Sequence, residues 1–309
     1  MKLLRQSRWD SRRRAAFSLL ELLVAVGLLS VIVLALYAMF DQTQKALHRS
    51  IAQTDVMEGG RSAFDLIVRD VERAHPTGVT GPIELPVYNL LVRKSPLSTQ
   101  AGPGSRDVIH RDATFSELYY MLPIRDRLWS AAGLFVASET DASQSVPVIN
   151  GVESVGTLYR YQAPSTVFVR GPGATTALGK LTSDLVNNTS FARNRRATNS
   201  TRLLDGVVFF RVLPYGGSGL PLDAVSIAPN LTLTNIVIAR PQGSPNTYLT
   251  TFTGAAMPNA VEVEFGVLPP KSLIQYRSVP DNLKAGYLTK HAAEILLFRQ
   301  RIALRSAIP

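Results

Sequence analysis

The clearest hydrophobic pattern is an apolar stretch close to the start of the chain. Residues 17–40 read FSLLELLVAVGLLSVIVLALYAMF, and Glu21 is the one charged residue among these 24. A helix rises about 1.5 Å per residue, so the stretch would span roughly 36 Å, more than the hydrocarbon core of a bilayer at about 30 Å. The pattern therefore predicts a membrane-spanning helix over residues 17–40.

Helical periodicity continues beyond residue 40, now with polar residues around one apolar stripe. The stripe consists of Phe64, Ile67, Val68 and Val71. The charged residues expected on the other faces are Arg61, Asp65, Arg69, Asp70, Glu72 and Arg73. This spacing predicts an amphipathic helix over 41–75 that packs against a core and stops at Pro76. Gly59 and Gly60 cost about 1 kcal/mol each relative to alanine, which predicts a weak point or a bend.

Residues 76–309 contain short apolar segments separated by clusters of Pro, Gly and Ser. We expect strands at 114–122, 156–162, 166–171, 206–214, 234–240 and 260–268. In the last segment Val261, Val263 and Phe265 alternate with Glu262 and Glu264, which predicts a half-buried strand. Long loops are expected at 95–106, 171–200 and 214–230, and a short helix or a loop at 281–294. Strands that follow a helix without regular alternation predict an α+β fold, with an antiparallel sheet packed on the long helix.

Charge is concentrated ahead of the apolar stretch. Residues 1–16 hold six basic residues and one acidic residue, a formal charge of +5, which is half of the chain's formal +10. By the positive-inside rule this cluster stays in the cytoplasm, so the domain at 76–309 is expected outside the inner membrane. The basic composition is thus explained by membrane topology more than by a nucleic-acid partner. The chain has no cysteine, which excludes disulfides and thiolate metal sites.

The apolar stretch has two ordinary interpretations, a secretory signal and an uncleaved membrane anchor. A secretory signal has an apolar region of about 7–15 residues before a small-residue cleavage site, whereas this stretch is longer and passes into YAMFDQTQKAL. A plain uncleaved anchor leaves Glu21 unexplained, because a carboxylate in a spanning helix costs free energy and calls for a partner.

The residues around the start of the stretch resemble the signal of type IV pilins and pseudopilins. RAAFSLLE, residues 14–21, has the basic leader, the small residue and the Phe-Ser-Leu-Leu-Glu of that signal. The resemblance implies that a prepilin peptidase removes residues 1–16 by cutting between Ala16 and Phe17, and that Phe17 becomes the N-methylated terminus. The family usually has Gly before the cut, and Ala16 is its nearest substitute in size. The spacing from Phe17 makes Glu21 the fifth residue of the mature chain.

The same resemblance implies a role for Glu21 in assembly. In the family this carboxylate meets the N-terminal amine of a neighbouring subunit, which neutralises two groups that would each be costly in a medium of low dielectric constant. A carboxylate that merely reaches the lipid headgroups is the alternative. The implied partners are other pilins or pseudopilins, prepilin peptidase and the inner membrane.

Blocks in the globular part are similar to those of J-type minor pseudopilins of type II secretion. They are LLDGVVFFRVLPYG, MPNAVEVEFGVLPP and the terminal LLFRQRIALRSAIP. The resemblance implies a non-catalytic subunit near the tip of a type II secretion pseudopilus, with a strand in each block. A minor type IV pilin of the W class, acting in pilus assembly, adhesion or DNA uptake, is the alternative.

Other functions find little support in the residues. His75, His110 and His291 are scattered, and GPGATTALGKLT departs from a phosphate loop in its glycine spacing and in Leu181, so it is interpreted as a flexible loop. The arginines at 193, 195, 196 and 202 form a basic stretch, but only Phe191 could stack on bases there. We therefore expect no enzyme, no metal, no cofactor and no nucleic-acid partner.

Overall fold

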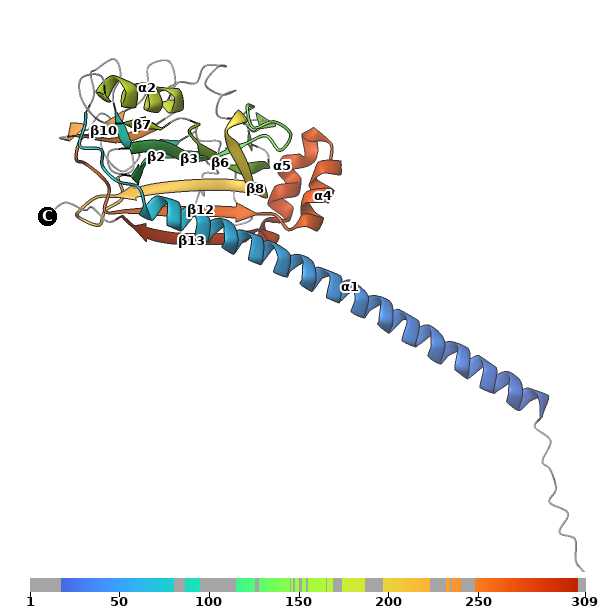
Figure 1. The fold of residues 1–309 in the computed structure, drawn as a ribbon. Helices are drawn as coiled ribbons and strands as arrows, with labels where there is room; N and C mark the ends of the chain where they lie inside the picture. The colour runs from blue at the N-terminus through green and yellow to red at the C-terminus, as the bar shows by residue number, and fades with distance from the viewer. Residues whose placement is uncertain are drawn as a thin grey trace, which may run out of the picture. The chain divides into compact units, whose positions relative to one another are not determined.

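The computed structural model defines one long helix and a sheet-based domain (Figure 1). The residues that it describes are 18–80, 87–94, 115–125, 128–144, 146, 148–149, 152–153, 155–164, 166–168, 174–186, 197–222, 232–233, 235–239 and 248–304. The chain divides into two compact units, Met1–Ile51 and Ala52–Pro309. The first contains the apolar part of the helix, and the second contains the rest of the helix with the sheet.

Helix α1, Leu19–Glu72, joins residues 19–40 of the predicted apolar segment and 41–72 of the predicted amphipathic segment in one element, and it ends three residues before the predicted end at 75. The predicted stripe is confirmed: Phe64, Ile67 and Val71 are buried, and Val68 packs against the same core. Helical structure continues through Gly59 and Gly60. Beyond Glu72 the chain leaves the helix, and the N–H of His75 donates to the carbonyl of Met121 on the sheet.

The domain is built on one antiparallel sheet, confirming the α+β prediction. In the described residues its order is β13-β12-β8-β6-β3-β2-β1-β11-β10-β9, with β7 paired to β3. The strands are β1 (Tyr88–Lys94), β2 (Ser116–Arg125), β3 (Leu128–Ala137), β6 (Gly156–Gln162), β7 (Val167–Phe168), β8 (Ser200–Tyr215), β9 (Thr232–Leu233), β10 (Ile236–Ala239), β11 (Tyr248–Thr253), β12 (Ala260–Val267) and β13 (Leu296–Ala303). A separate hairpin pairs β4 (Val148–Ile149) with β5 (Val152–Glu153).

Each predicted strand segment contains an observed strand, but three long strands had no sequence prediction. These are β1, β3 and β11, of which β1 and β3 lie well inside the sheet. The last, β13, was expected only through the pseudopilin resemblance. The segment at 281–294 is helical, as α5 (Asp281–Lys290) and the 3-10 turn η1 (Ala292–Glu294), and it follows α4 (Pro270–Ser278).

The two faces of the sheet are covered by different helices. The second half of α1 packs on one face, where the rings of Phe64, Phe265 and Phe298 stack in sequence with centroids 5.3 and 5.1 Å apart. Helix α2, Ala174–Val186, covers the other face through Leu178 and Leu181. Helices α4 and α5 lie beside the ends of β8 and β12 (Figure 1), and they form a smaller core with Val155, Val208 of β8 and Leu268.

The predicted loop at 171–200 is partly wrong, because it contains α2. Ala174, Ala177 and the leucines at 178 and 181 favour a helix, and the two leucines lie three residues apart, so they share the face that the sheet buries. The predicted loop at 214–230 also begins too early, since β8 extends to Tyr215. The loop expected at 95–106 lies outside the described residues.

Two predictions about exposed acidic residues are wrong. Strand β12 is buried along its whole length, not on one face only, because arginines of both neighbouring strands cover Glu262 and Glu264. Asp70 was placed on a solvent face of the helix, yet it is 6% exposed. Its carboxylate is turned to partners on the sheet, so charge by itself did not indicate the buried face.

Candidate functional site

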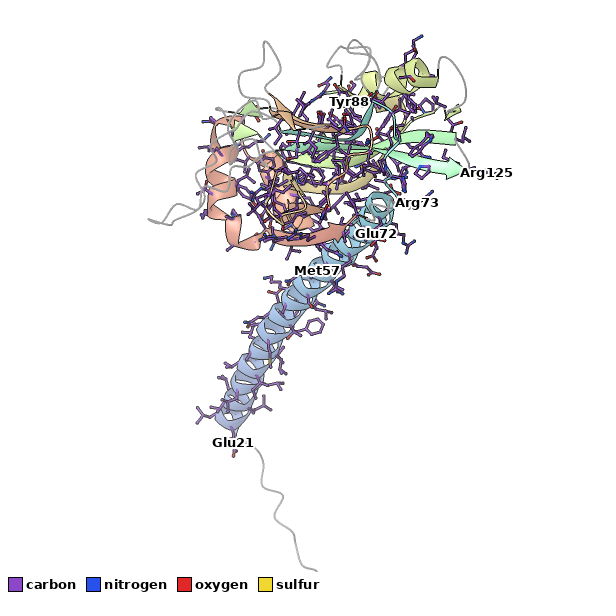
Figure 2. The ribbon with its side chains drawn as sticks, turned by 90° about the vertical axis from the view of Figure 1, so that its left-hand side faces the viewer. Glu21, Met57, Glu72, Arg73, Tyr88 and Arg125 are labelled. Carbon is purple, nitrogen blue, oxygen red and sulfur yellow. The ribbon has the colours of Figure 1, made fainter. Side chains whose placement is uncertain are left out.

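The candidate site begins in the first turn of α1, where Ser18 caps the helix. The N–H of Glu21 donates to the hydroxyl oxygen of Ser18 at 3.2 Å and to its carbonyl at 3.0 Å. Ser18 and Glu21 have the spacing of a capping box, in which the first side chain satisfies an unpaired N–H of the helix start. The sequence therefore fixes Glu21 in the first turn, and its side chain is exposed (Figure 2). A carboxylate at this end is also favoured by the helix dipole.

The helix after Glu21 presents apolar side chains on all its faces. Those that are at least half exposed include Leu22, Leu23, Val24, Val26, Leu28, Leu29, Val31, Ile32, Val33, Leu34, Leu36, Met39 and Phe40. A helix that is apolar all round suits a hydrocarbon environment or a bundle of like helices, not water. This one apolar helix is compatible with a single-pass membrane anchor.

Polar groups near this segment are satisfied within the helix. The hydroxyl of Ser30 donates to the carbonyl of Val26 at 2.8 Å, so it imposes no unpaired donor on an apolar environment. Charge returns directly after the apolar stretch, where Asp41 forms an ion pair with Lys45 at 2.6 Å. Glu21 is thus the ionisable residue that the described part of the apolar stretch has to accommodate.

At its other end α1 is tied to the sheet by a buried polar cluster. The carboxylate of Asp70 forms an ion pair with Arg160 of β6 and accepts a hydrogen bond from the hydroxyl of Tyr120 of β2 at 3.3 Å. The side chains of Asp70 and Arg160 are 8% and 19% exposed. Burial, with the nearby Asp70 carboxylate as a second cause, raises the pKa of Tyr120 well above its usual value. The phenol therefore stays protonated and remains a donor to Asp70.

This cluster was missed by sequence reasoning, and the chain offers no local signal for it. Tyr120 and Arg160 lie 50 and 90 residues from Asp70. Asp70 directly precedes the buried Val71, and its neighbours Arg69 and Glu72 are exposed, so composition and spacing do not separate it from them.

Several predicted site residues fall outside the described residues. Ala16, Phe17 and the leader at 1–16 are among them, as are His110 and the arginines at 193, 195 and 196. Arg202, the last member of that basic stretch, does not lie in a loop: it belongs to β8 and pairs with Asp205.

The described histidines lie apart from one another. His75 contacts the carbonyl of Pro76 through Nδ1, and His291 pairs with Glu294 at 3.0 Å. Within the described residues, no three His, Asp or Glu side chains are grouped so as to hold a metal ion.

Comparison with known families identifies the N-terminal segment. Residues 11–37 match the prokaryotic N-terminal methylation motif. The match supports a pilin-like protein of the type IV pilin or pseudopilin class, whose members are structural subunits that assemble into fibres. No curated protein and no solved structure matches the chain.

Proposed function

We propose that this protein is a minor pseudopilin, a non-catalytic subunit of a type II secretion pseudopilus that acts near the tip of the fibre. The observation that carries the proposal is the methylation motif at 11–37, which includes most of an apolar helix segment exposed on every face. Motif and helix together match what a fibre subunit needs, namely a processed terminus and a surface for packing against other helices. The J-type blocks around β8, β12 and β13 favour the pseudopilin over the pilin.

Processing is proposed at the bond between Ala16 and Phe17, by a prepilin peptidase on the cytoplasmic side of the inner membrane. Removal of 1–16 leaves Phe17 as the terminus, which becomes N-methylated. The basic leader stays cytoplasmic by the positive-inside rule, and the sheet domain lies outside the membrane. Ser18, which caps α1, would then be the second residue of the mature chain, so the new terminus lies directly beside the helix start.

Glu21 is proposed to pair with the N-terminal amine of Phe17 in a neighbouring subunit. In a hydrocarbon environment an unpaired carboxylate and an unpaired ammonium are each costly, and their attraction grows as the dielectric constant falls. Pairing two costly groups makes subunit contact favourable inside the membrane, where apolar helices alone have little hydrophobic drive to associate. The exposure of Glu21 in the first turn supports this role.

A minor type IV pilin of the W class, acting in assembly, adhesion or DNA uptake, is the second candidate, because the methylation motif suits both. Co-purification from membranes separates them. A pseudopilin should capture other small pseudopilins in fixed proportion, whereas a pilus-tip binder should retain an external ligand after those partners are deleted.

N-terminal mass spectrometry of the protein isolated from membranes tests the class directly. The expected result is a chain that starts with N-methylated Phe17. An intact Met1, or a cut at a different bond, would contradict the proposal.

A further inference from the structure

Strand β13 forms one end of the sheet and presents different residues on its two faces. It pairs with β12 along Leu296–Ala303, and no described strand pairs with its other edge. Phe298 and Ile302 point to the face that α1 covers and are buried in that core. The alternate residues Leu297, Arg299 and Arg301 are exposed on the opposite face. Gln300, which lies between Phe298 and Ile302, is also exposed, so β13 is mainly apolar on one face and mainly basic on the other.

The basic face of β13 belongs to a charged row across three strands. In register, Glu264 of β12 lies between Arg211 of β8 and Arg299 of β13, and Glu262 lies opposite Arg301. Arg299 donates to one oxygen of Glu262 at 2.9 Å, and Arg211 lies 3.8 Å from Glu264. The two carboxylates have side chains only 8–9% exposed, whereas the three arginines are exposed.

This row contains three arginines and two glutamates, so some N–H donors of the arginines have no carboxylate to bind. A guanidinium has five N–H donors, and the contacts of Arg299 with Glu262 use its Nε and Nη2 atoms. The guanidinium of Arg301 lies 3.8 Å from the centroid of the Tyr215 ring on β8, which is a cation–π contact. Such stacking uses the face of the guanidinium and none of its N–H donors. Among the described residues, Arg301 donates no hydrogen bond to a carboxylate.

Strand β12 shows what kind of strand fits against β13. It sets Val261, Val263 and Phe265 on the apolar face, and Glu262 and Glu264 beside the arginines. Because residues alternate with period two, a strand on the open edge would meet the same two faces of β13. We propose that this edge binds, by strand addition, a β-strand of another fibre subunit in which acidic and apolar residues alternate. The inference rests on the proposed role as a fibre subunit.

Charge also determines which strands cannot pair with the open edge of β13. A second copy of β13 pairing there would bring arginines against arginines, and like charges directly opposite each other destabilise a sheet. Charged side chains on edge strands commonly serve to block such unwanted pairing. Here the block is selective, because it excludes basic and like strands but not acidic ones.

The test uses the full chain in detergent with two synthetic peptides. One alternates valine with glutamate, and its control alternates valine with lysine. We expect the glutamate peptide to bind more tightly, and hydrogen exchange of the amides in Leu296–Ala303 to slow when it binds. Arg301→Gln should weaken its binding roughly two- to fivefold, the range for one cross-strand charge pair. Arg277→Gln is the control, because it removes one arginine of α4 that is 48% exposed and that pairs with Glu139, not with a residue of β12 or β13.

Three results would overturn the inference. Equal binding of both peptides would remove the role of charge, and binding without slower exchange in β13 would remove strand addition. The protein could also bind phosphatidylglycerol vesicles through Arg301 and show no preference between the peptides. That result would identify the arginine face of β13 as a lipid contact. The peptide measurement does not depend on processing at Phe17, so its failure and a failure of the proposed function are distinguishable.

Discussion

Asp70 of α1 and Arg160 of β6 form a buried ion pair that joins the long helix to the middle of the sheet. Tyr120 of β2 donates a hydrogen bond to the same carboxylate at 3.3 Å. The pair matters because a force applied to α1 within a fibre would reach the sheet through this contact and the apolar stripe around it.

Replacing Asp70 by Asn should destabilise the domain. The change leaves the guanidinium of Arg160 without its carboxylate at a site that is largely shielded from water, which typically costs about 3–5 kcal/mol for a fully buried pair. Arg160 keeps some exposure, so we expect about 2–3 kcal/mol. Urea unfolding of the full chain in detergent measures the loss. Asp65→Asn, on an exposed face of the same helix, should change the unfolding free energy by less than about 0.5 kcal/mol. Equal losses for both variants would contradict the assigned role.

Gly59 and Gly60 should respond oppositely to alanine. A Cβ on Gly60 would lie 2.1 Å from Cζ of Phe298, so the ring or the helix must move. Overpacking of this kind costs about 1–3 kcal/mol. A Cβ on Gly59 meets only Cδ1 of Leu204 at 3.9 Å, and the higher helix propensity of alanine should stabilise by up to about 1 kcal/mol. Thermal unfolding of the two variants checks the signs, and a stabilising Gly60→Ala would show that α1 does not approach β13 closely.

Glu21→Leu should separate assembly from insertion. The variant loses the carboxylate but keeps an apolar helix, so it should insert into the membrane and be processed like the wild type. Incorporation into fibres, measured by co-purification with other subunits, should fall at least tenfold if the pairing is worth about 1.4 kcal/mol or more. Glu58→Leu, which changes an exposed carboxylate outside the apolar stretch, is the control. Normal incorporation of the Glu21 variant would remove the proposed pairing.

Glu294 should contribute a small acid-dependent part of the stability. A hydrogen bond from the hydroxyl of Ser272, and then the contact with His291, lower the pKa of the Glu294 carboxyl. A lowered pKa in the folded state means that the contribution is present above the unfolded value of about 4.3 and is lost as the pH falls below it. The side chain is 48% exposed, so the effect should stay below about 1 kcal/mol. Unfolding free energies measured from pH 7 to pH 3 should fall less steeply for Glu294→Gln than for the wild type, and parallel curves would refute the assignment.

The sequence alone determined the features that depend on neighbours along the chain. The apolar stretch and the signal around Phe17 are readable because each is a continuous run of residues, and the stripe of Phe64, Ile67 and Val71 is readable because a helix repeats its faces every three to four residues. Ser18 and Glu21 also form their capping contact within one turn. These local patterns are enough to predict an α+β fold and a candidate assembly segment.

Tertiary structure decided what depends on residues far apart in the sequence. Strand β3 had no sequence signal, since Ser130, Ala131, Ala132 and Gly133 lack the usual strand character, yet the ring of Tyr119 needs the space that Gly133 leaves. The burial of Glu262 is set by Arg299 and Tyr215, which lie on neighbouring strands. Asp70 found its partners 50 and 90 residues away. In each case the pattern states only what a side chain is, whereas its environment depends on which strand or helix the fold places beside it.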